Sequence, residues 1–348
     1  METLISSLNT QFVFSVTHAS DVAAARRGGQ QLAQDMGFDE TRAGQLAIII
    51  TETATNIVKH GVAGKVFVGP AQTHVSGIDV IAFDTGPGID DIDLALRDGV
   101  SSAGTAGNGL GALVRLSDEF DLYSTRDKGA AFFMRLYREA PEAGGKHGRG
   151  ALPLDIGALS VPLAGEDETG DGWAVAVDAR GANLMGVDGL GHGPVAAEAA
   201  LAAIESLAKS PAAEPARVVD NAHNVMRATR GAALAAARID FERDEVRFAG
   251  IGNIGACVYD DEGVRRQLVS HNGIVGNNMR KVQEFTVPCS TGALCILHSD
   301  GLSTQWSLES YPGLQARHPA LIACVLMRDF ARARDDAMVL VVRRLGCP

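Results

Sequence analysis

Acidic residues stand at the ends of hydrophobic, strand-like runs at four places in the second half of the chain. They are Asp171-Gly172, Asp188-Gly189, Asp300-Gly301 and the pair Asp335-Asp336. One such dipeptide is typical of a β-turn, but four at the ends of hydrophobic runs are poorly explained that way. Carboxylates without a Cys/His cluster select hard divalent ions, Mg²⁺ or Mn²⁺. Two such ions can share a bridging water that attacks a phosphate ester, so the pattern predicts a metal-dependent hydrolase.

A second pattern with chemical potential lies near residue 50. Glu52 and Asn56 are four residues apart, which on a helix places both side chains on one face, one turn apart. An Asn carbonyl oxygen is a suitable ligand for magnesium, and a neighbouring carboxylate can take a proton from a hydroxyl group. Taken alone, however, such a pair is more often part of a solvated helix face.

Two glycine-rich segments follow this pair. Asp84, Gly86 and Gly88 form D-x-G-x-G directly after a strand-like run. The Asp can accept a hydrogen bond from an amino group, and the glycines let the backbone approach a flat ligand, although an ordinary glycine turn has the same pattern. Residues 104–111 then run into a helix predicted from Gly109, where exposed N–H groups form a site for phosphate.

The elements that must position these residues differ between the two halves. The first half predicts helices at 20–36, 40–60 and 109–116, and strands at 78–83, 120–124 and 131–137. The second half predicts strands at 173–178, 183–187, 237–241, 245–249, 254–259, 293–299 and 337–344, with alanine-rich helices at 194–208 and 216–236. Strands in series with helices grouped between them favour a layered α+β fold over alternating βαβ units.

The clearest boundary is the segment 139–150, EAPEAGGKHGRG, which is rich in glycine and almost free of apolar residues. It is typical of a flexible linker. The sequence therefore predicts one domain over 1–138 and a second over 151–348.

Composition narrows the classes of partner and compartment. The net charge of −11 disfavours nucleic acid and anionic lipid, and the 5% aromatic content disfavours a base-stacking surface. The N-terminus does not resemble a signal peptide, and no apolar run reaches 18 residues. Five cysteines without a C-x-x-C pair fit a reducing compartment. We expect a cytoplasmic protein that does not contact membrane.

Other motifs carry less information. No G-x-x-x-x-G-K-[ST] sequence occurs, which excludes a P-loop. Residues 250–255 match G-x-G-x-x-G, but a strand-like run follows where a dinucleotide-binding fold requires a helix. His192 and His298 lie near the acidic motifs, although a single His beside a glycine turn or in a strand is more often structural.

In order and spacing, the three motifs of the first half resemble the N, G1 and G2 boxes of the GHKL ATPases. The sequence from Gly109 to Leu136 is also similar to the small bacterial serine kinases that act on anti-anti-sigma (STAS) proteins, in particular the stressosome type. Over residues 10–138 the resemblance implies a Bergerat-type α/β sandwich that binds ATP with Mg²⁺, with Glu52 as the base for a serine or threonine hydroxyl. Asp84 would bind adenine, Asn56 would bind Mg²⁺ and Gly107–Gly111 would surround the phosphates. The implied nucleotide-binding residues are Asn56, Asp84, Gly86, Gly88, Gly107, Gly109, Leu110 and Gly111.

The second half resembles the SpoIIE-like branch of the metal-dependent (PPM) serine/threonine phosphatases over about residues 152–345. Its markers are D-G-x-G-H-G, S-D-G and the D-D before the last strand. The resemblance implies an α-β-β-α sandwich with two Mn²⁺ or Mg²⁺ ions. The implied metal ligands are Asp171, Asp188, the carbonyl of Gly189, Asp300 and Asp335. Asp188 would bridge the ions, whereas the segment before Asp171 has only one of the expected glycines. The usual A-G-H-P segment is altered to residues 249–253, AGIGN.

Together, these resemblances imply a bifunctional enzyme that phosphorylates and dephosphorylates a STAS-domain signalling protein. Two alternatives remain: a nucleotide-regulated module that sequesters a partner without turnover, and a phosphatase controlled by an ATP-sensing but non-catalytic first domain. Glu52 argues against pure binding, because ATP capture does not need a base. The sequence defines neither the partner nor the oligomeric state.

Overall fold

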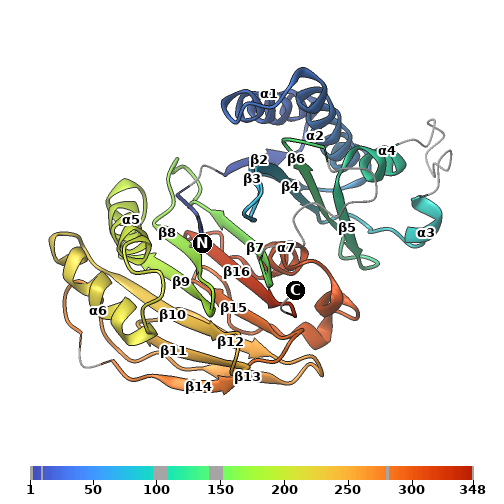
Figure 1. The fold of residues 1–348 in the computed structure, drawn as a ribbon. Helices are drawn as coiled ribbons and strands as arrows, with labels where there is room; N and C mark the ends of the chain where they lie inside the picture. Colours follow the sequence, from blue (N-terminus) through green and yellow to red (C-terminus); the bar gives the residue numbers. More distant parts are fainter. Residues whose placement is uncertain (1–2, 9–10, 97–108, 141–151, 280–281, 347–348) are drawn as a thin grey trace. The chain divides into compact units, whose positions relative to one another are not determined.

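The computed structural model describes residues 3–8, 11–96, 109–140, 152–279 and 282–346. The chain divides into two compact units (Figure 1). Unit 1 comprises Met1–Leu8, Gly150–Ser310 and Asp329–Pro348, and unit 2 comprises Asn9–Arg149 and Tyr311–Arg328. In the described part of the chain, no helix has both the length and the apolar composition needed to cross a bilayer.

Unit 2 contains an antiparallel sheet with strand order β2-β3-β4-β6-β5 in its described residues. The strands are β2 (Phe12–Val16), β3 (Gly64–Pro70), β4 (Gly77–Asp84), β5 (Glu119–Ser124) and β6 (Ala130–Tyr137). The helices are α1 (Ala19–Asp35), α2 (Glu40–His60), α3 (Ile92–Ala95), α4 (Gly109–Leu116) and, from the second half of the sequence, α7 (Pro319–Phe330). The predicted helices near 20–36, 40–60 and 109–116 are confirmed.

Helix α2 is fixed by its cap and by one apolar face. The Asp39 carboxylate accepts a hydrogen bond from the backbone N–H of Arg42 at 2.7 Å and so satisfies an otherwise free donor. The residues buried along the helix, at spacings of mostly three and four, include Leu46, Ile49, Ile50, Thr53, Ala54 and Ile57. This face packs with α1, α4 and the sheet in one core. Glu52 and Asn56 lie beside the buried face, and both are half-buried.

Residues 311–328 pack on strands of unit 2 far away in the sequence. The His318 ring stacks on Phe133 with centroids 3.9 Å apart, and the backbone N–H of His318 donates to Asp121 at 2.8 Å. The Cys324 thiol donates to the carbonyl of Ala82 in β4 at 3.5 Å. In α7, Pro319–Met327 are all buried.

Unit 1 contains two antiparallel sheets in its described residues, with strand orders β1-β8-β9-β10-β11-β14 and β13-β12-β15-β16-β7. The first comprises β1 (Thr3–Ser6), β8 (Asp171–Val177), β9 (Gly181–Gly189), β10 (Ala232–Asp240), β11 (Glu245–Ile251) and β14 (Phe285–Pro288). The second comprises β7 (Leu154–Val161), β12 (Gly255–Tyr259), β13 (Arg265–Leu268), β15 (Leu294–His298) and β16 (Ala337–Arg344). Apolar side chains of both sheets form one core. Helices α5 (Pro194–Ala208) and α6 (Pro215–Val225) pack on the other face of the first sheet. The predicted α+β class is confirmed.

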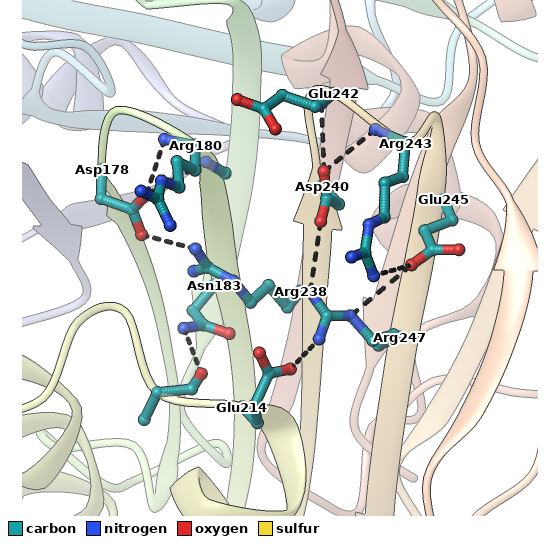
Figure 2. A network of polar contacts seen from close by, with 12 residues as sticks. Asp178, Arg180, Asn183, Glu214, Arg238, Asp240, Glu242, Arg243, Glu245 and Arg247 are labelled. Carbon is teal, nitrogen blue, oxygen red and sulfur yellow. Dashed lines mark hydrogen bonds and ion pairs between the residues drawn. The ribbon is translucent and has the colours of Figure 1, made fainter.

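Ion pairs join the strands at one end of the first sheet, as Figure 2 shows. Arg238 in β10 donates to Asp178 at 2.8 Å, and Arg247 in β11 pairs with Asp240 at 3.3 Å and also with Glu214. Arg238 and Arg247 are thus matched by acidic side chains, which gives these two arginines a structural role.

The predicted helix over 216–236 is wrong in its second part. Helix α6 ends at Val225, a 3₁₀ turn occupies Met226–Ala228, and Ala232–Asp240 form β10. Gly231 adopts φ +84°, which is incompatible with a helix that continues through this position, and a Cβ there would lie 2.5 Å from the Val275 carbonyl oxygen. The alanines of β10 have high helix propensity, but pairing with β9 and β11 and burial on both faces override it.

The predicted domains 1–138 and 151–348 differ from the compact units at two places. Residues 3–6 form β1, which pairs with β8 and places Ile5 opposite Val175 in the core of unit 1. Residues 311–328 group with unit 2 because of the contacts described above. Most of the predicted linker, 139–150, lies outside the described residues.

Ile5→Ala should therefore destabilise unit 1 rather than unit 2. Truncation of a buried Ile costs about 2–5 kcal/mol, so amide hydrogen exchange should accelerate in β8 and remain unchanged in β4. Leu4→Ala is the matched control, because Leu4 is 37% exposed on the opposite face of the same strand. Faster exchange confined to β4 would instead assign residues 3–6 to the first domain.

Candidate active sites

The first site combines the C-terminal half of α2 with the end of β4. Asp84 is the last residue of β4 and is buried, and its Oδ1 accepts from the backbone N–H of Gly86 at 2.8 Å. A Cβ at Gly61 would lie 2.8 Å from Cβ of Asp84, and one at Gly86 would lie 2.8 Å from the His60 carbonyl oxygen. Only glycines allow the turn after β4 to pack on the end of α2. This contact brings Asp84 close to the helical turn that begins at Asn56.

Burial raises the pKa of Asp84. Hydrogen bonds from the N–H groups of Gly86 and Ala130 oppose this rise, as do the positive charges of Arg328 and His60. A buried acceptor at the mouth of a glycine turn is suited to an amino group of a flat ligand. Gly88 belongs to the same turn, where φ is +79° and a Cβ would lie 2.5 Å from the Thr125 carbonyl oxygen.

The third predicted segment is described only in part. Gly107 lies outside the described residues. Gly109, Leu110 and Gly111 form the first turn of α4, and Leu110 packs against the core that contains α2. Helix α4 therefore begins where the sequence predicted.

The second site gathers acidic residues from both sheets of unit 1. Asp171 in β8 lies directly opposite Asp188 in β9. Asp300 follows β15 and Asp335 precedes β16, and these strands are neighbours in the second sheet. We call Asp171, Asp188, Asp300 and Asp335 the carboxylate cluster. A Cβ at Gly189 would lie 2.3 Å from the Ala196 carbonyl oxygen, so this position also requires glycine.

Asp336 differs from its neighbour Asp335. Its carboxylate is buried and accepts from the backbone N–H groups of Leu163 at 2.6 Å and Gly170 at 2.7 Å. Asp335 is exposed, and the charge of Asp300 acts on its side chain. The two adjacent acids thus separate into a structural carboxylate and one that is available to a ligand.

The carboxylate cluster is destabilised by its own charge. Burial, followed by the charges of Asp300 and Asp335, raises the pKa of Asp188 to about 7. Burial and the charge of Asp188 raise the pKa of Asp171 well above its usual range, and burial and Asp300 raise that of Asp335. Oδ2 of Asp171 is buried and has no hydrogen-bond partner among the described residues. Clustered carboxylates with an unsatisfied oxygen fit a hard divalent cation.

The cluster is not a closed ligand shell as it stands. Among the described residues, no three His, Cys, Asp or Glu side chains are grouped closely enough to hold a metal ion. The carboxylates would have to converge on an ion, whose positive charge would offset the repulsion among them.

Neighbouring polar residues show which side chains the sequence motifs overlooked. The amide nitrogen of Asn253, from the altered A-G-H-P segment, donates to Oδ2 of Asp300. His192 Nδ1 pairs with Glu166 at 2.7 Å. His298 is buried, donates from Nδ1 to the Ser299 carbonyl at 2.8 Å and packs edge-on against Trp306. His298 is thus a core residue, as its position in a strand indicated.

Comparison with known proteins identifies relatives for each half of the chain. Residues 14–136 match the model of the histidine kinase-like ATPase domain, and residues 178–345 match that of stage II sporulation protein E (SpoIIE). The chain is 34% identical over 123 residues to the serine/threonine-protein kinase RsbT of Bacillus subtilis (strain 168), which covers 35% of this chain and 92% of RsbT. The chain belongs to the family of the histidine kinase-like ATPase domains. Its first half is a histidine kinase-like ATPase domain, and its second half is a SpoIIE domain of the PPM-type serine/threonine phosphatases.

A further curated protein and two solved structures are also similar to this chain. Phosphoserine phosphatase RsbX of the same organism is 26% identical over 140 residues, 40% of this chain and 70% of RsbX. A solved structure described as "The bacterial stressosome: a modular system that has been adapted to control secondary messenger signaling" matches 55% of this chain and 99% of its own, with 27% identity and a TM-score of 0.52. RsbX in complex with magnesium shares the fold over 55% of this chain and 94% of its own, with 18% identity and a TM-score of 0.50. The predicted order of the two domains is confirmed.

Without metal, the SpoIIE domain should become less stable as the pH rises. Asp188 has a pKa of about 7 in the folded state against an ordinary value of 3.8. Between these values the folded state holds more protons than the unfolded state, so the free energy of unfolding falls with rising pH. Mn²⁺ competes with these protons, and its effect on the melting temperature should be larger at about pH 7.5 than at about pH 5.5.

Thermal melts with Mn²⁺ and with a chelator check this expectation. Asp188→Asn should flatten the pH dependence of the metal-free protein and reduce the Mn²⁺ shift. Glu198→Gln, an exposed change on α5, should alter neither. Equal Mn²⁺ shifts in the two variants would contradict a metal site at Asp188.

Proposed function

We propose that the chain is a bifunctional switch enzyme, which phosphorylates a serine or threonine of a STAS-domain signalling protein and removes the same phosphate. One observation carries the proposal: a single chain spans most of the length of both a serine/threonine kinase and a phosphoserine phosphatase. Opposed activities in one chain imply a shared substrate.

In the SpoIIE domain, the carboxylate cluster and the carbonyl of Gly189 would hold two Mn²⁺ or Mg²⁺ ions. When bound, such ions activate water and stabilise charge that develops on the phosphoryl group. The protein itself supplies the positions. Gly170 and Gly189 are joined by a backbone hydrogen bond of 3.1 Å, which fixes the strand ends that carry Asp171 and Asp188.

In the ATPase domain, Asp84 would bind the adenine amino group and Asn56 would bind the Mg²⁺ of ATP. Gly107–Gly111 would surround the phosphates. Glu52, one helical turn before Asn56, would accept the proton of the substrate hydroxyl. The half-buried position of both side chains on α2 leaves them accessible to a ligand.

Asp188→Ala should abolish phosphatase activity and leave kinase activity intact. Removal of a central ligand should lower Mn²⁺-dependent hydrolysis of p-nitrophenyl phosphate by about 10³-fold or more. Transfer from labelled ATP to a STAS-domain protein should continue, so the phosphorylated partner should accumulate. Hydrolysis at the parental rate would rule out Asp188 as a ligand.

Glu52→Gln should abolish phosphate transfer without weakening ATP binding. The amide keeps the shape of the side chain but cannot accept a proton, and loss of a positioned base costs about 10²- to 10⁴-fold. Calorimetry with ATP and phosphosite mapping of the STAS protein measure the two effects. If neither the parent nor the variant transfers phosphate while both bind the STAS protein, the domain sequesters its partner instead.

The place of residues 311–328 favours a second function, a phosphatase controlled by nucleotide. The segment lies between Asp300 and Asp335 in the sequence but groups with unit 2. The charge of Arg328, at its end, lowers the pKa of Asp84 against the effect of burial. The segment thus connects two proposed metal ligands to the proposed adenine site.

If this second function operates, ATP should alter the rate of phosphatase turnover. We expect a change of about fivefold or more, the lower range of allosteric coupling, when Mn²⁺ is in large excess over nucleotide. Asp84→Asn should lose the effect together with ATP affinity, whereas Glu52→Gln should retain it. Identical rates with and without bound ATP would show that the domains act independently.

A further inference from the structure

The ends of four neighbouring strands carry opposite kinds of polar group. Asp171 and Asp188 lie at this end of β8 and β9, and Asp188 faces Ala233 of β10 across the ladder. At the same end, Arg230 precedes β10 and Asn253 follows β11. At this end of the sheet, β8 and β9 therefore carry hydrogen-bond acceptors, whereas donors flank β10 and β11.

The backbone around Arg230 is held rigidly. Oγ1 of Thr229 accepts from the N–H of Gly231 at 3.1 Å and donates to the carbonyl of Met226 at 2.8 Å. The carbonyl of Gly231 accepts from the N–H of Leu190 at 3.0 Å. Arg230 is thus fixed on one side to the end of α6 and on the other to the turn that follows Asp188.

The guanidinium group of Arg230 lies over Gly191. A Cβ at Gly191 would lie 3.0 Å from Nη1 of Arg230, and no other heavy atom of the described residues approaches as closely there. Gly191 also adopts φ +99°. The turn after Asp188 therefore leaves space for a guanidinium group three residues from the carboxylate cluster.

The positive charge of Arg230 is not neutralised by an acidic side chain among the described residues. Its side chain is exposed and makes no ion pair or hydrogen bond with the residues that the structure describes. At the opposite end of the same sheet, Arg238 and Arg247 are matched by acids (Figure 2). Arg230 is thus an arginine beside an acidic site, in a chain with a net charge of −11, whose donors are available to a ligand.

We propose that Arg230 binds the phosphoryl oxygens of the phosphorylated serine or threonine substrate. The inference rests on the proposed phosphatase function. A phosphate monoester carries nearly two negative charges at neutral pH, and the acidic residues of this domain repel it. A guanidinium group presents two parallel N–H donors to two phosphate oxygens, which ammonium cannot do. Arg230 would therefore orient the phosphoryl group without taking part in bond cleavage.

The test measures phosphate affinity in the full-length chain with Mn²⁺. Arg230→Ala should raise the KM for p-nitrophenyl phosphate and the inhibition constant of inorganic phosphate by about 10- to 100-fold, as expected for loss of a hydrogen bond to a charged group. Arg230→Lys should recover only part of the loss. Arg227→Ala, an exposed arginine three residues earlier, is the matched control and should change neither value.

Two further readouts separate the possible failures. The Mn²⁺-induced melting shift should be equal in the parent and in Arg230→Ala, and its loss would mean that Arg230 only supports the fold. Calorimetry with inorganic phosphate does not require turnover. If the parent hydrolyses no phosphomonoester yet binds phosphate through Arg230, the phosphatase function fails and the assignment of Arg230 stands. Equal phosphate affinity in Arg230→Ala and Arg227→Ala would overturn that assignment.

Discussion

The geometry of the SpoIIE domain depends above all on the buried carboxylate of Asp336. Its two oxygens accept from the N–H groups of Leu163 and Gly170 and so tie the first residues of β16 to the loop before β8. Gly170 precedes Asp171, and a Cβ at Gly301 would lie 1.7 Å from the Asp336 carbonyl oxygen. Asp171, Asp300 and Asp335 are therefore each adjacent in sequence to a residue that makes these contacts. Backbone donors satisfy both oxygens of Asp336. Asp336 therefore positions the cluster, although its own charge also contributes to the raised pKa of Asp171.

The distribution of charge in the SpoIIE domain follows from the same division of roles. Acids at one end of the first sheet pair with arginines. Within the described part of the chain, Asp171 and Asp188 at the other end have no arginine partner, and their pKa values are raised. Repulsion among these acids lowers the stability of the folded domain. Burial of the apolar core elsewhere in the domain offsets this cost. The unmatched Arg230 lies at the end where the unmatched acids lie. Net charge alone could not show this separation.

Local patterns in the sequence predicted most of the elements but not every partner. The acids at strand ends and the capped α2 carry short-range signals, and the structure brings Asp171 opposite Asp188. In contrast, β1 joins β8 across more than 160 residues, and no periodicity within four residues indicates such a pairing. The roles of Asp335 and Asp336 differ only through the loop that reaches Asp336. Arg230 lies within 216–236, which the sequence predicts to be helical. Its approach to Gly191 exists only because Ala232–Asp240 form a strand.

Helix α7 limits how far the two domains can be treated as separate modules. An amphipathic helix has one apolar stripe, whereas residues 319–327 of α7, PALIACVLM, contain no charged side chain on any face. Its segment supplies His318 and Cys324 to the sheet of the ATPase domain, while Asp300 and Asp335 on either side of it remain in the SpoIIE domain. Cutting the chain near residue 145 would therefore leave each fragment without an element that it needs. Regulation between two sites requires an element whose state both can bias, and chain connectivity places α7 in that position.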